Sequence, residues 1–332
     1  MLSVQLCLWK SCVNCQPATT RYMKVSGFTF VRNAVLYDYP VVEAIQSILP
    51  LCDEFVVAVG KSDDGTLELI KNIQSAKIKI IETVWDDRLR KGGKILAVET
   101  DKAFQEIASD SDWAFYIQGD EVVHEKYHEG IRKAMEEYKN DSHVDGLLFN
   151  YLHFYGSYNY VGESSRWYRR EIRLIKNNRQ FFSFKDAQGF RKKPNAKLNV
   201  KPLDAFVYHY GHVREPRAMQ RKHHSTNRFW HSDRWINHNI KRRTEFDYSN
   251  HEPLSLFHGT HPAIMKKRIS EMDWEFEYDM SKKQFELKDH LKNFFEKLTG
   301  WRPGEYRNYK IVNKGTAKLL EYMKKSFALK PA

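Results

Sequence analysis

Two adjacent carboxylates, Asp120 and Glu121, come directly after a hydrophobic run of the chain. The run, residues 113–117, has the length and composition of a buried strand. In open α/β sheets, ligands bind in the crevice outside the carboxyl ends of the strands. Hard divalent cations are held by one or two carboxylates together with substrate phosphates. The pattern therefore predicts a metal ion and a phosphorylated substrate near Asp120 and Glu121, with an acidic turn as the alternative.

A second candidate site is the glycine-containing basic turn at residues 91–94, which precedes a helical pattern. Glycines allow the backbone to approach a ligand closely, and a helix N-terminus favours anions. Arg90 and Lys94 are therefore candidates for contacts to a diphosphate, with a solvated basic turn as the alternative. Arg32 and Asn33 follow the first predicted strand, where they would contact a ribose or base or would only cap the next helix.

The segments that must position these side chains alternate between strand and helix. Strand patterns lie at residues 24–31, 54–59, 78–84, 113–117 and 146–154. Helical patterns lie between them and are found at residues 39–51, 66–73, 94–107 and 127–138. Shorter strand patterns follow at residues 171–175, 181–184 and 205–210. The alternation predicts an α/β fold with a doubly wound, mostly parallel sheet. Asp64 lies in the turn before the second helix, where it would also serve as an N-cap.

Changes in these patterns divide the chain into three regions. The segment before Met23 lacks the features of a signal peptide, so we expect an extension with Met23 as the natural start. Beyond residue 216 the pattern becomes mostly helical, with many aromatic and basic residues. The expected regions are an N-terminal extension at 1–22, a domain at 23–225 with halves 23–125 and 126–225, and a helical, aromatic-rich C-terminal extension at 226–332.

Composition narrows the possible partners. The chain of 332 residues has a formal net charge of +12, which favours nucleic acid, an anionic membrane surface or phosphorylated small molecules as partners. No apolar run approaches the roughly 20 residues of a membrane-spanning helix, which predicts a soluble protein. Cys12 and Cys15 form a lone pair without the second pair that a structural zinc site needs.

Five segments, in their order along the chain, resemble motifs of glycosyltransferase family 2, which has the GT-A fold. They are residues 26–34 (SGFTFVRNA), 62–66 (SDDGT), 118–121 (QGDE), 184–190 (FKDAQGF) and 207–212 (VYHYGH). The resemblance covers residues 24–225. The chain departs from the family at Gln118, which replaces the first Asp of the metal-binding D-x-D, and at Val59 or Gly60, where a base-reading Asp is usual. The second departure leaves the nucleobase open.

The resemblance implies transfer of a sugar from a nucleoside diphosphate sugar to an acceptor hydroxyl, with inversion, in cell-surface polysaccharide or glycoconjugate synthesis. It implies a divalent metal, Mn or Mg, held by Asp120 and His209, with His212 as the alternative histidine. A histidine ligand would favour Mn²⁺ over Mg²⁺. The acceptor would be a glycan or a lipid-linked molecule, and the location would be cytoplasmic, with peripheral contact to the inner face of the membrane as an option.

The resemblance also implies roles for further residues. The expected nucleotide contacts are Thr29, Arg32, Asn33, Asp64, Arg90 and Lys94, with Glu121 orienting the site or binding the sugar. Asp186 is the expected general base that deprotonates the acceptor hydroxyl, with Glu163 and Glu171 as rivals.

Other classes of function are compatible with parts of the sequence. A nucleotidyltransferase would carry a glycine-rich basic loop after the first strand, and residues 26–34 contain one glycine and no such loop. A nucleic-acid-binding protein would explain the net charge, but no RNP-like, zinc-finger or helix-turn-helix pattern occurs. A catalytically inactive GT-A scaffold would explain Gln118 and Val59.

Overall fold

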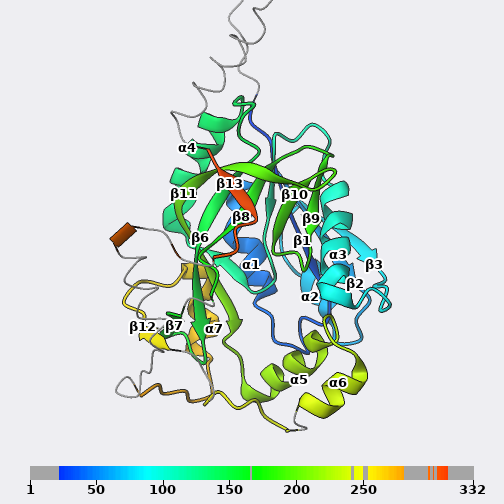
Figure 1. The fold of residues 1–332 in the computed structure, drawn as a ribbon, viewed down its shortest axis with the longest axis vertical. Coiled ribbons are helices and arrows are strands. Elements are labelled where there is room, and N and C mark those ends of the chain that lie inside the picture. The colour runs from blue at the N-terminus through cyan, green and yellow to red at the C-terminus, as the bar shows by residue number, and fades with distance from the viewer. Residues whose placement is uncertain are drawn as a thin grey trace, which may run out of the picture.

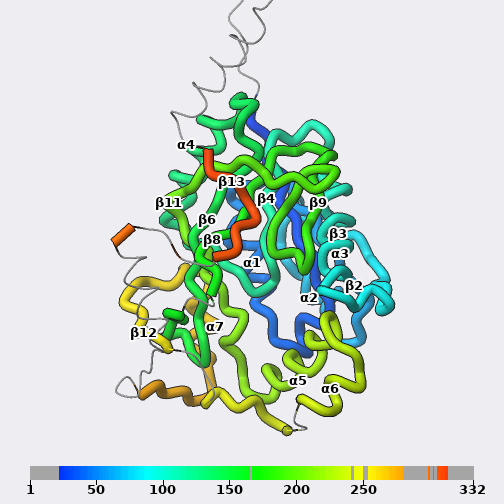
Figure 2. The backbone as a smooth tube through the Cα atoms, in the orientation of Figure 1, coloured from blue at the N-terminus to red at the C-terminus, as the bar shows by residue number. Residues whose placement is uncertain are grey.

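The computed structural model describes residues 22–164, 167–240, 243–249, 253–279, 298–299, 302 and 305–312. The predicted N-terminal extension lies outside these ranges, except for Tyr22. Figure 2 follows the backbone from the first strand, in blue, to the last described segment, in red, which pairs with a strand from the middle of the chain.

The first half of the chain forms the predicted parallel sheet (Figure 1). Its strands lie in the order β3 (Ile78–Thr83), β2 (Glu54–Gly60), β1 (Val25–Val31) and β4 (Trp113–Tyr116), and every pairing among them is parallel. The strands β1, β2 and β4 are buried along nearly their whole length. Strands covered on both faces read as continuous apolar runs rather than as an alternating pattern, which explains these sequences.

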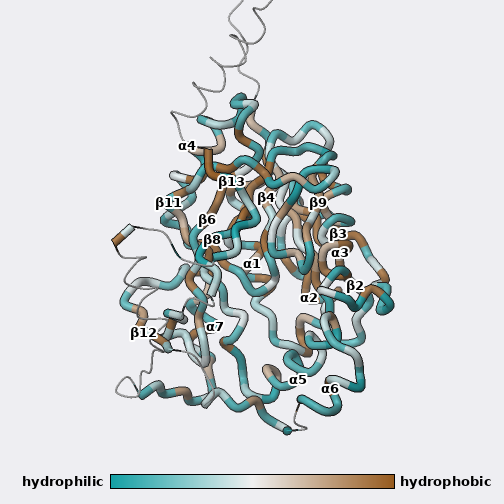
Figure 3. The backbone as a smooth tube through the Cα atoms, in the orientation of Figure 1, coloured by the Kyte–Doolittle hydropathy of each residue, from teal (hydrophilic) through white to brown (hydrophobic). Residues whose placement is uncertain are grey.

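Helices cover both faces of this sheet, so the doubly wound α/β prediction is confirmed. One hydrophobic cluster joins the sheet to α1 (Val41–Ile48), α2 (Thr66–Lys71) and α4 (His128–Tyr138). A second cluster joins the opposite face to α3 (Lys94–Gln105). In Figure 3 the hydrophobic residues concentrate on the strands, and the segments around α5 and α6 are mainly hydrophilic.

The second half of the chain extends the sheet with mixed pairing. Beyond β4 the order is β8 (Arg170–Lys176), β6 (Gly146–Tyr155), β11 (Ala196–His212), β10 (Gly189–Lys192) and β9 (Phe181–Phe184). The strand β8 is antiparallel to both β4 and β6, so β4 and β6 run in the same direction, and β11 is parallel to β6. The short strand β5 (Glu121–Val123) pairs with β11 and brings Glu121 opposite His209.

The helical C-terminal extension is not confirmed by the described residues. After α5 (Pro216–Asn227), the described chain forms the short helices α6 (Asp233–Asn239) and α7 (Lys266–Ser270), and residues 298–299 are also helical. The strand β12 (Leu254–Leu256) pairs with β7 (Tyr160–Gly162), and β13 (Tyr309–Ile311) pairs with β11. The 3₁₀ turns are η1 (Leu49–Leu51), η2 (Lys91–Gly93), η3 (Glu125–Tyr127) and η4 (Ala263–Met265). Within the described ranges, each helix is too short or too polar to cross a bilayer.

Candidate active site

A cleft of about 770 Å³ lies at the carboxyl ends of the parallel strands. Its walls include the segments that follow β1, β3 and β4, together with helix α5 and the loop after it. The crevice outside the strand ends is where open α/β sheets bind ligands, which makes this cleft the candidate active site. The predicted site residues that line it are Arg32, Asn33, Arg90, Asp120, Asp186 and His209.

Four predicted site residues do not line the cleft: Thr29, Asp64, Lys94 and Glu121. Thr29 is fully buried inside β1, where its hydroxyl donates to a neighbouring backbone carbonyl. Lys94 is exposed at the start of α3.

Asp64 organises a loop that borders the cleft. Its carboxylate accepts hydrogen bonds from the backbone N–H of Leu36 at 2.7 Å and from the hydroxyl of Thr66 at 2.6 Å. The same turn provides the hydroxyl of Ser62, which accepts from the backbone N–H of Asn33 at 2.9 Å. The segment 62–66 therefore fixes the loop after β1, and Asn33 adopts a positive φ of 55° there, which asparagine tolerates better than most residues.

Arg90 lines the cleft, but its guanidinium is engaged by protein groups. It donates to Asp233 at 2.8 Å and to the backbone carbonyls of Arg228 at 2.9 Å and His231 at 3.1 Å. Arg90 therefore ties the turn before α3 to the segment that joins α5 and α6.

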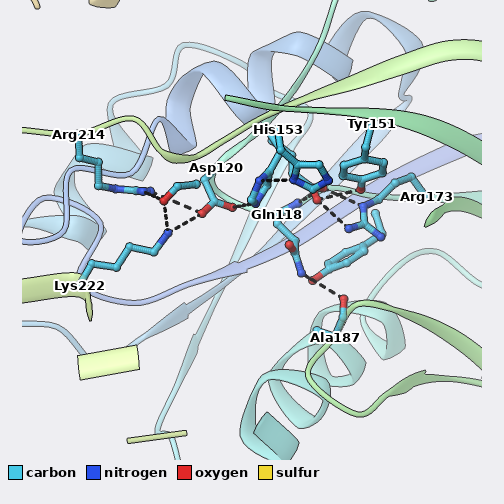
Figure 4. Close-up of polar contacts among 12 residues, drawn as sticks. Gln118, Asp120, Tyr151, His153, Arg173, Ala187, Arg214 and Lys222 are labelled. Carbon is cyan, nitrogen blue, oxygen red and sulfur yellow. Dashed lines mark hydrogen bonds and ion pairs between the residues drawn. The ribbon is translucent and has the colours of Figure 1, made fainter. Parts of the chain in front are cut away.

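Glu121 does not line the cleft and forms a buried ion pair with Arg173, which Figure 4 labels. Both of its carboxylate oxygens accept hydrogen bonds from Arg173 at 2.7 Å, and the Tyr151 hydroxyl donates to it at 2.8 Å. Glu121 and Arg173 are both fully buried. Because the oxygens of Glu121 are occupied inside the protein, we assign it to the support of the site and not to sugar binding.

Asp120 projects toward cationic side chains that the sequence motifs did not include (Figure 4). Its carboxylate lies 3.0 Å from the Lys222 ammonium and 3.5 Å from a terminal guanidinium nitrogen of Arg214. Burial alone would raise the pKa of Asp120, but the neighbouring cations, Lys222 first, hold that pKa well below its usual value. Asp120 is therefore a buried carboxylate whose ionised form is stabilised by neighbouring cations.

The residues around Asp120 do not fit a resident divalent cation. His209 Nε2 lies 3.7 Å from the Asp120 carboxylate, and the described part of the chain contains no group of three acidic, histidine or cysteine side chains placed to hold a metal. Hard cations require several oxygen ligands. Here Gln118 replaces one carboxylate of the motif, and Lys222 and Arg214 occupy the surroundings of the remaining one.

His209 is paired with a second buried imidazole, His153. The Nε2 of His153 lies 2.8 Å from the Tyr168 carbonyl, which can only accept, so Nε2 carries the proton. Burial lowers the pKa of His153 to about 3 and that of His209 to about 4, so both rings are neutral at pH 7. The 3.1 Å contact between the two Nδ1 atoms then requires His209 Nδ1 to donate. The lone pair of His209 therefore lies on Nε2, the nitrogen nearer Asp120.

Asp186 lies in the tight loop between β9 and β10. Its neighbours Lys185 and Ala187 have positive φ angles of 56° and 62°, which cost non-glycine residues about 1–3 kcal/mol each. The Ala187 carbonyl accepts a hydrogen bond from the side chain of Gln118 at 3.1 Å, so the residue that replaces the first motif Asp holds this loop. Burial raises the pKa of Asp186.

The rival bases have other surroundings. Neither Glu163 nor Glu171 lines the cleft. Glu171 is buried behind it, where burial raises the pKa of its carboxyl to about 8.

An aromatic surface forms another part of the cleft wall. The Trp85 ring packs between Phe30 and Phe229, with centroid separations of 5.7 and 5.8 Å, and the Arg32 guanidinium lies 5.3 Å from its centre. A Cβ on Gly60 would lie 2.4 Å from the indole nitrogen, so the glycine at this strand end leaves room for the tryptophan. The surface formed by Trp85 and Arg32 therefore lies next to Gly60, at the strand end where the sequence lacks a base-reading Asp.

Sequence reasoning missed five residues that shape the site: Lys222, Arg214, Arg173, His153 and Trp85. One signal was available. Because Gln118 stands where the motif has its first Asp, only one of the two motif aspartates remains, and another positive group could then take the place of the metal ion. The pattern could not identify that cation, since Lys222 is 102 positions from Asp120 and approaches only through packing of α5.

No known protein-family profile matches the chain, and no curated protein matches it in sequence. Partial likenesses occur among solved structures. S. aureus TarS is 14% identical over 61% of this chain and 39% of its own, with a TM-score of 0.36. Glucosyl-3-phosphoglycerate synthase from Mycobacterium tuberculosis, in complex with Mn²⁺, UDP and glucosyl-3-phosphoglycerate, is 14% identical over 40% of this chain and 45% of its own, with a TM-score of 0.28. This chain spans less than half the length of either protein, and likenesses this weak do not establish a family.

Proposed function

We propose that the protein transfers a sugar from a nucleoside diphosphate sugar to an acceptor hydroxyl, as a GT-A-type glycosyltransferase. The observation that carries the proposal is the gathering of three kinds of groups in one cleft: the Trp85–Arg32 surface, the cations beside Asp120, and the Asp186 carboxylate. An aromatic face stacks on a base, cations match a diphosphate, and a carboxylate with a raised pKa accepts a proton. A nucleotide sugar and its acceptor need all three.

The proposed reaction is a direct displacement. The acceptor oxygen attacks the anomeric carbon while the bond between that carbon and the diphosphate oxygen breaks. The proton of the acceptor hydroxyl passes to Asp186, and the electron pair leaves with the diphosphate. Attack opposite the leaving group inverts the anomeric centre. Preorganised cationic groups are needed to stabilise the charge that develops on the diphosphate.

The proposal extends to the acceptor and the pathway. We propose a glycan or lipid-linked acceptor and a place in cell-surface polysaccharide or glycoconjugate synthesis, as family 2 enzymes have. The net charge of +12 supports an acceptor presented at an anionic surface.

The direct test is a thermal-shift screen of nucleoside diphosphates and nucleotide sugars, each with Mn²⁺ and with EDTA. A ligand that binds only the native state raises stability by mass action, by about 2.7 kcal/mol at 100 times its Kd. One base family should raise the melting temperature of the wild type, and Trp85→Ala should lose the shift. The control is Trp235→Ala, which removes a half-exposed ring outside the cleft. If no nucleotide shifts the folded protein, the inactive scaffold or the nucleic-acid binder becomes the better account.

Activity should fall on the acid side as Asp186 gains a proton. Burial raises its pKa, opposed by backbone hydrogen bonds and Lys185, so the acid limb of kcat/KM should have its midpoint above the usual aspartate value of about 3.9. The check is a pH profile, with circular dichroism at each pH to separate proton uptake from unfolding. A rate that stays constant well below this range would remove Asp186 as the base.

Two neighbouring glycines offer a matched pair of variants. Gly92 and Gly93 both have positive φ, 65° and 69°, but a Cβ on Gly93 would lie 2.5 Å from the Cβ of Asp186, whereas one on Gly92 would meet nothing within 4 Å. Both alanine variants should lose about 1 kcal/mol because of the positive φ, and Gly93→Ala should lose more because its Cβ also meets Asp186. Only Gly93→Ala should also lower the transfer rate, by about 100-fold, because it displaces the base. Equal rates in the two variants, measured alongside their melting temperatures, would contradict the assigned position of Asp186.

A further inference from the structure

The cluster around Asp120 contains more positive than negative charge. Lys222 and Arg214 carry two positive charges against the single negative charge of Asp120, which leaves an excess of positive charge. All three charged side chains are nearly or fully buried, with side-chain exposures of 14% for Lys222, 11% for Asp120 and 0% for Arg214. A buried charge without a counter-charge is costly, so the cluster is built to receive an anion.

The two cations are held in place by the protein. Lys222 donates to the Gly211 carbonyl at 2.8 Å as well as to Asp120, and both Lys222 and Arg214 lie over the Tyr39 ring, at 5.0 and 4.6 Å from its centre. The terminal nitrogen of Arg214 that lies 3.5 Å from Asp120 is buried and makes no hydrogen bond within the described residues, so its contact with Asp120 is an ion pair alone. Lys222 lines the cleft, whereas Arg214 is fully buried and does not line it. Groups fixed in this way need no reorganisation when an anion binds.

We infer that Lys222, supported by Arg214, supplies the counter-charge for the diphosphate of the donor, so that this protein binds its donor without a divalent cation. The inference rests on the proposed function and names the ligand class of the site as a diphosphate. Asp120 is then the internal counter-ion that partly offsets the two cations, and not a metal ligand.

Charge explains why a divalent cation is disfavoured at the same place. A divalent cation would add two positive charges to a cluster in which positive charge already exceeds negative charge. It would also compete for the Asp120 carboxylate with the Lys222 ammonium, which lies 3.0 Å away. The motif residue that would contribute a second carboxylate is Gln118, whose amide donates to the Tyr116 hydroxyl and the Ala187 carbonyl. The metal-binding and lysine-based accounts therefore predict opposite effects of removing the charge of Asp120.

The test is a calorimetric titration of the full chain with inorganic diphosphate in EDTA, and separately with MnCl₂ alone. Diphosphate should bind in EDTA, and Lys222→Met should weaken that binding by roughly 10- to 100-fold, as expected for loss of a charge-assisted hydrogen bond. Asp120→Asn should retain or tighten the binding, because it removes the internal anion that competes for Lys222. Lys71→Met, at the exposed end of α2, is the matched control and should bind as the wild type does.

Two results would overturn the inference: diphosphate binding that appears only with Mn²⁺, or loss of binding in a folded Asp120→Asn variant. Melting temperatures of all variants exclude unfolding as the cause, and Asp120→Asn keeps the test decisive if Lys222→Met does not fold. The outcome is separate from that of the proposed function. Diphosphate binding in EDTA without binding of any nucleotide sugar would support the anion site and refute the transferase, whereas Mn²⁺-dependent nucleotide-sugar binding would do the reverse.

Discussion

Replacing Asp186 by asparagine is expected to lower the rate of sugar transfer by about 10²–10⁴-fold, the range that general-base catalysis contributes. Asparagine keeps the shape of the side chain but cannot accept the proton of the acceptor hydroxyl. Because Asp186 acts on the acceptor, kcat should fall while the apparent affinity for the donor stays close to that of the wild type. Steady-state kinetics with a nucleotide sugar and an acceptor measure both quantities.

The control for this variant is Asp63→Asn, which removes an exposed carboxylate outside the cleft and should leave the rate unchanged. A folded Asp186→Asn variant with the wild-type kcat would show that another group accepts the proton. The His209 lone pair on Nε2 would then be the next candidate, because it also lies in the cleft.

Replacing Arg173 by methionine is expected to reduce the free energy of unfolding by about 3–5 kcal/mol, because it leaves the Glu121 carboxylate buried without its cation. Both side chains are fully buried, and Glu121 is the neighbour in sequence of Asp120, which lines the cleft. The double variant Glu121→Met/Arg173→Met should recover most of this loss, since apolar residues can replace a buried ion pair with little net cost. Urea denaturation of the three proteins gives the free energies.

A surface arginine provides the comparison for this prediction. Arg88 pairs with Asp86 at 2.8 Å but is almost fully exposed, so Arg88→Met should change the free energy of unfolding by less than about 1 kcal/mol. If Arg173→Met has an equally small effect, the buried pair of Glu121 and Arg173 does not stabilise the fold beside the site.

Much of the fold could be predicted because the strands of its first half are covered on both sides. Burial on both faces produces the continuous apolar runs of β1, β2 and β4, and burial of one face produces the helical spacing of apolar residues in α3. Both patterns can be recognised in the sequence. The helical extension expected at 226–332 could not be judged in the same way. Aromatic and basic residues there, such as those of α6, suit a surface helix or an irregular segment equally well.

Only those residues of the candidate site that directly follow the parallel strands could be predicted from the sequence. Residues that follow parallel strands meet at one edge of a sheet, so Arg32 and Asp120 were expected together and do line one cleft. Asp120 and Glu121 were expected to act in the same site, but Asp120 lies in the turn after β4 and Glu121 is the first residue of β5. Asp120 therefore lines the cleft, whereas Glu121 is buried and pairs with Arg173.

Donor turnover tests the assignment of the cleft most directly. It is measured as release of nucleoside diphosphate from a panel of nucleotide sugars, with EDTA and with Mn²⁺, by the wild type and by Asp186→Asn. We expect one base family to release its diphosphate with the wild type, faster when an acceptor glycan is added, and little release with the variant. Absence of release from every nucleotide sugar under both conditions, with protein shown to be folded, would contradict the assignment of the cleft to sugar transfer.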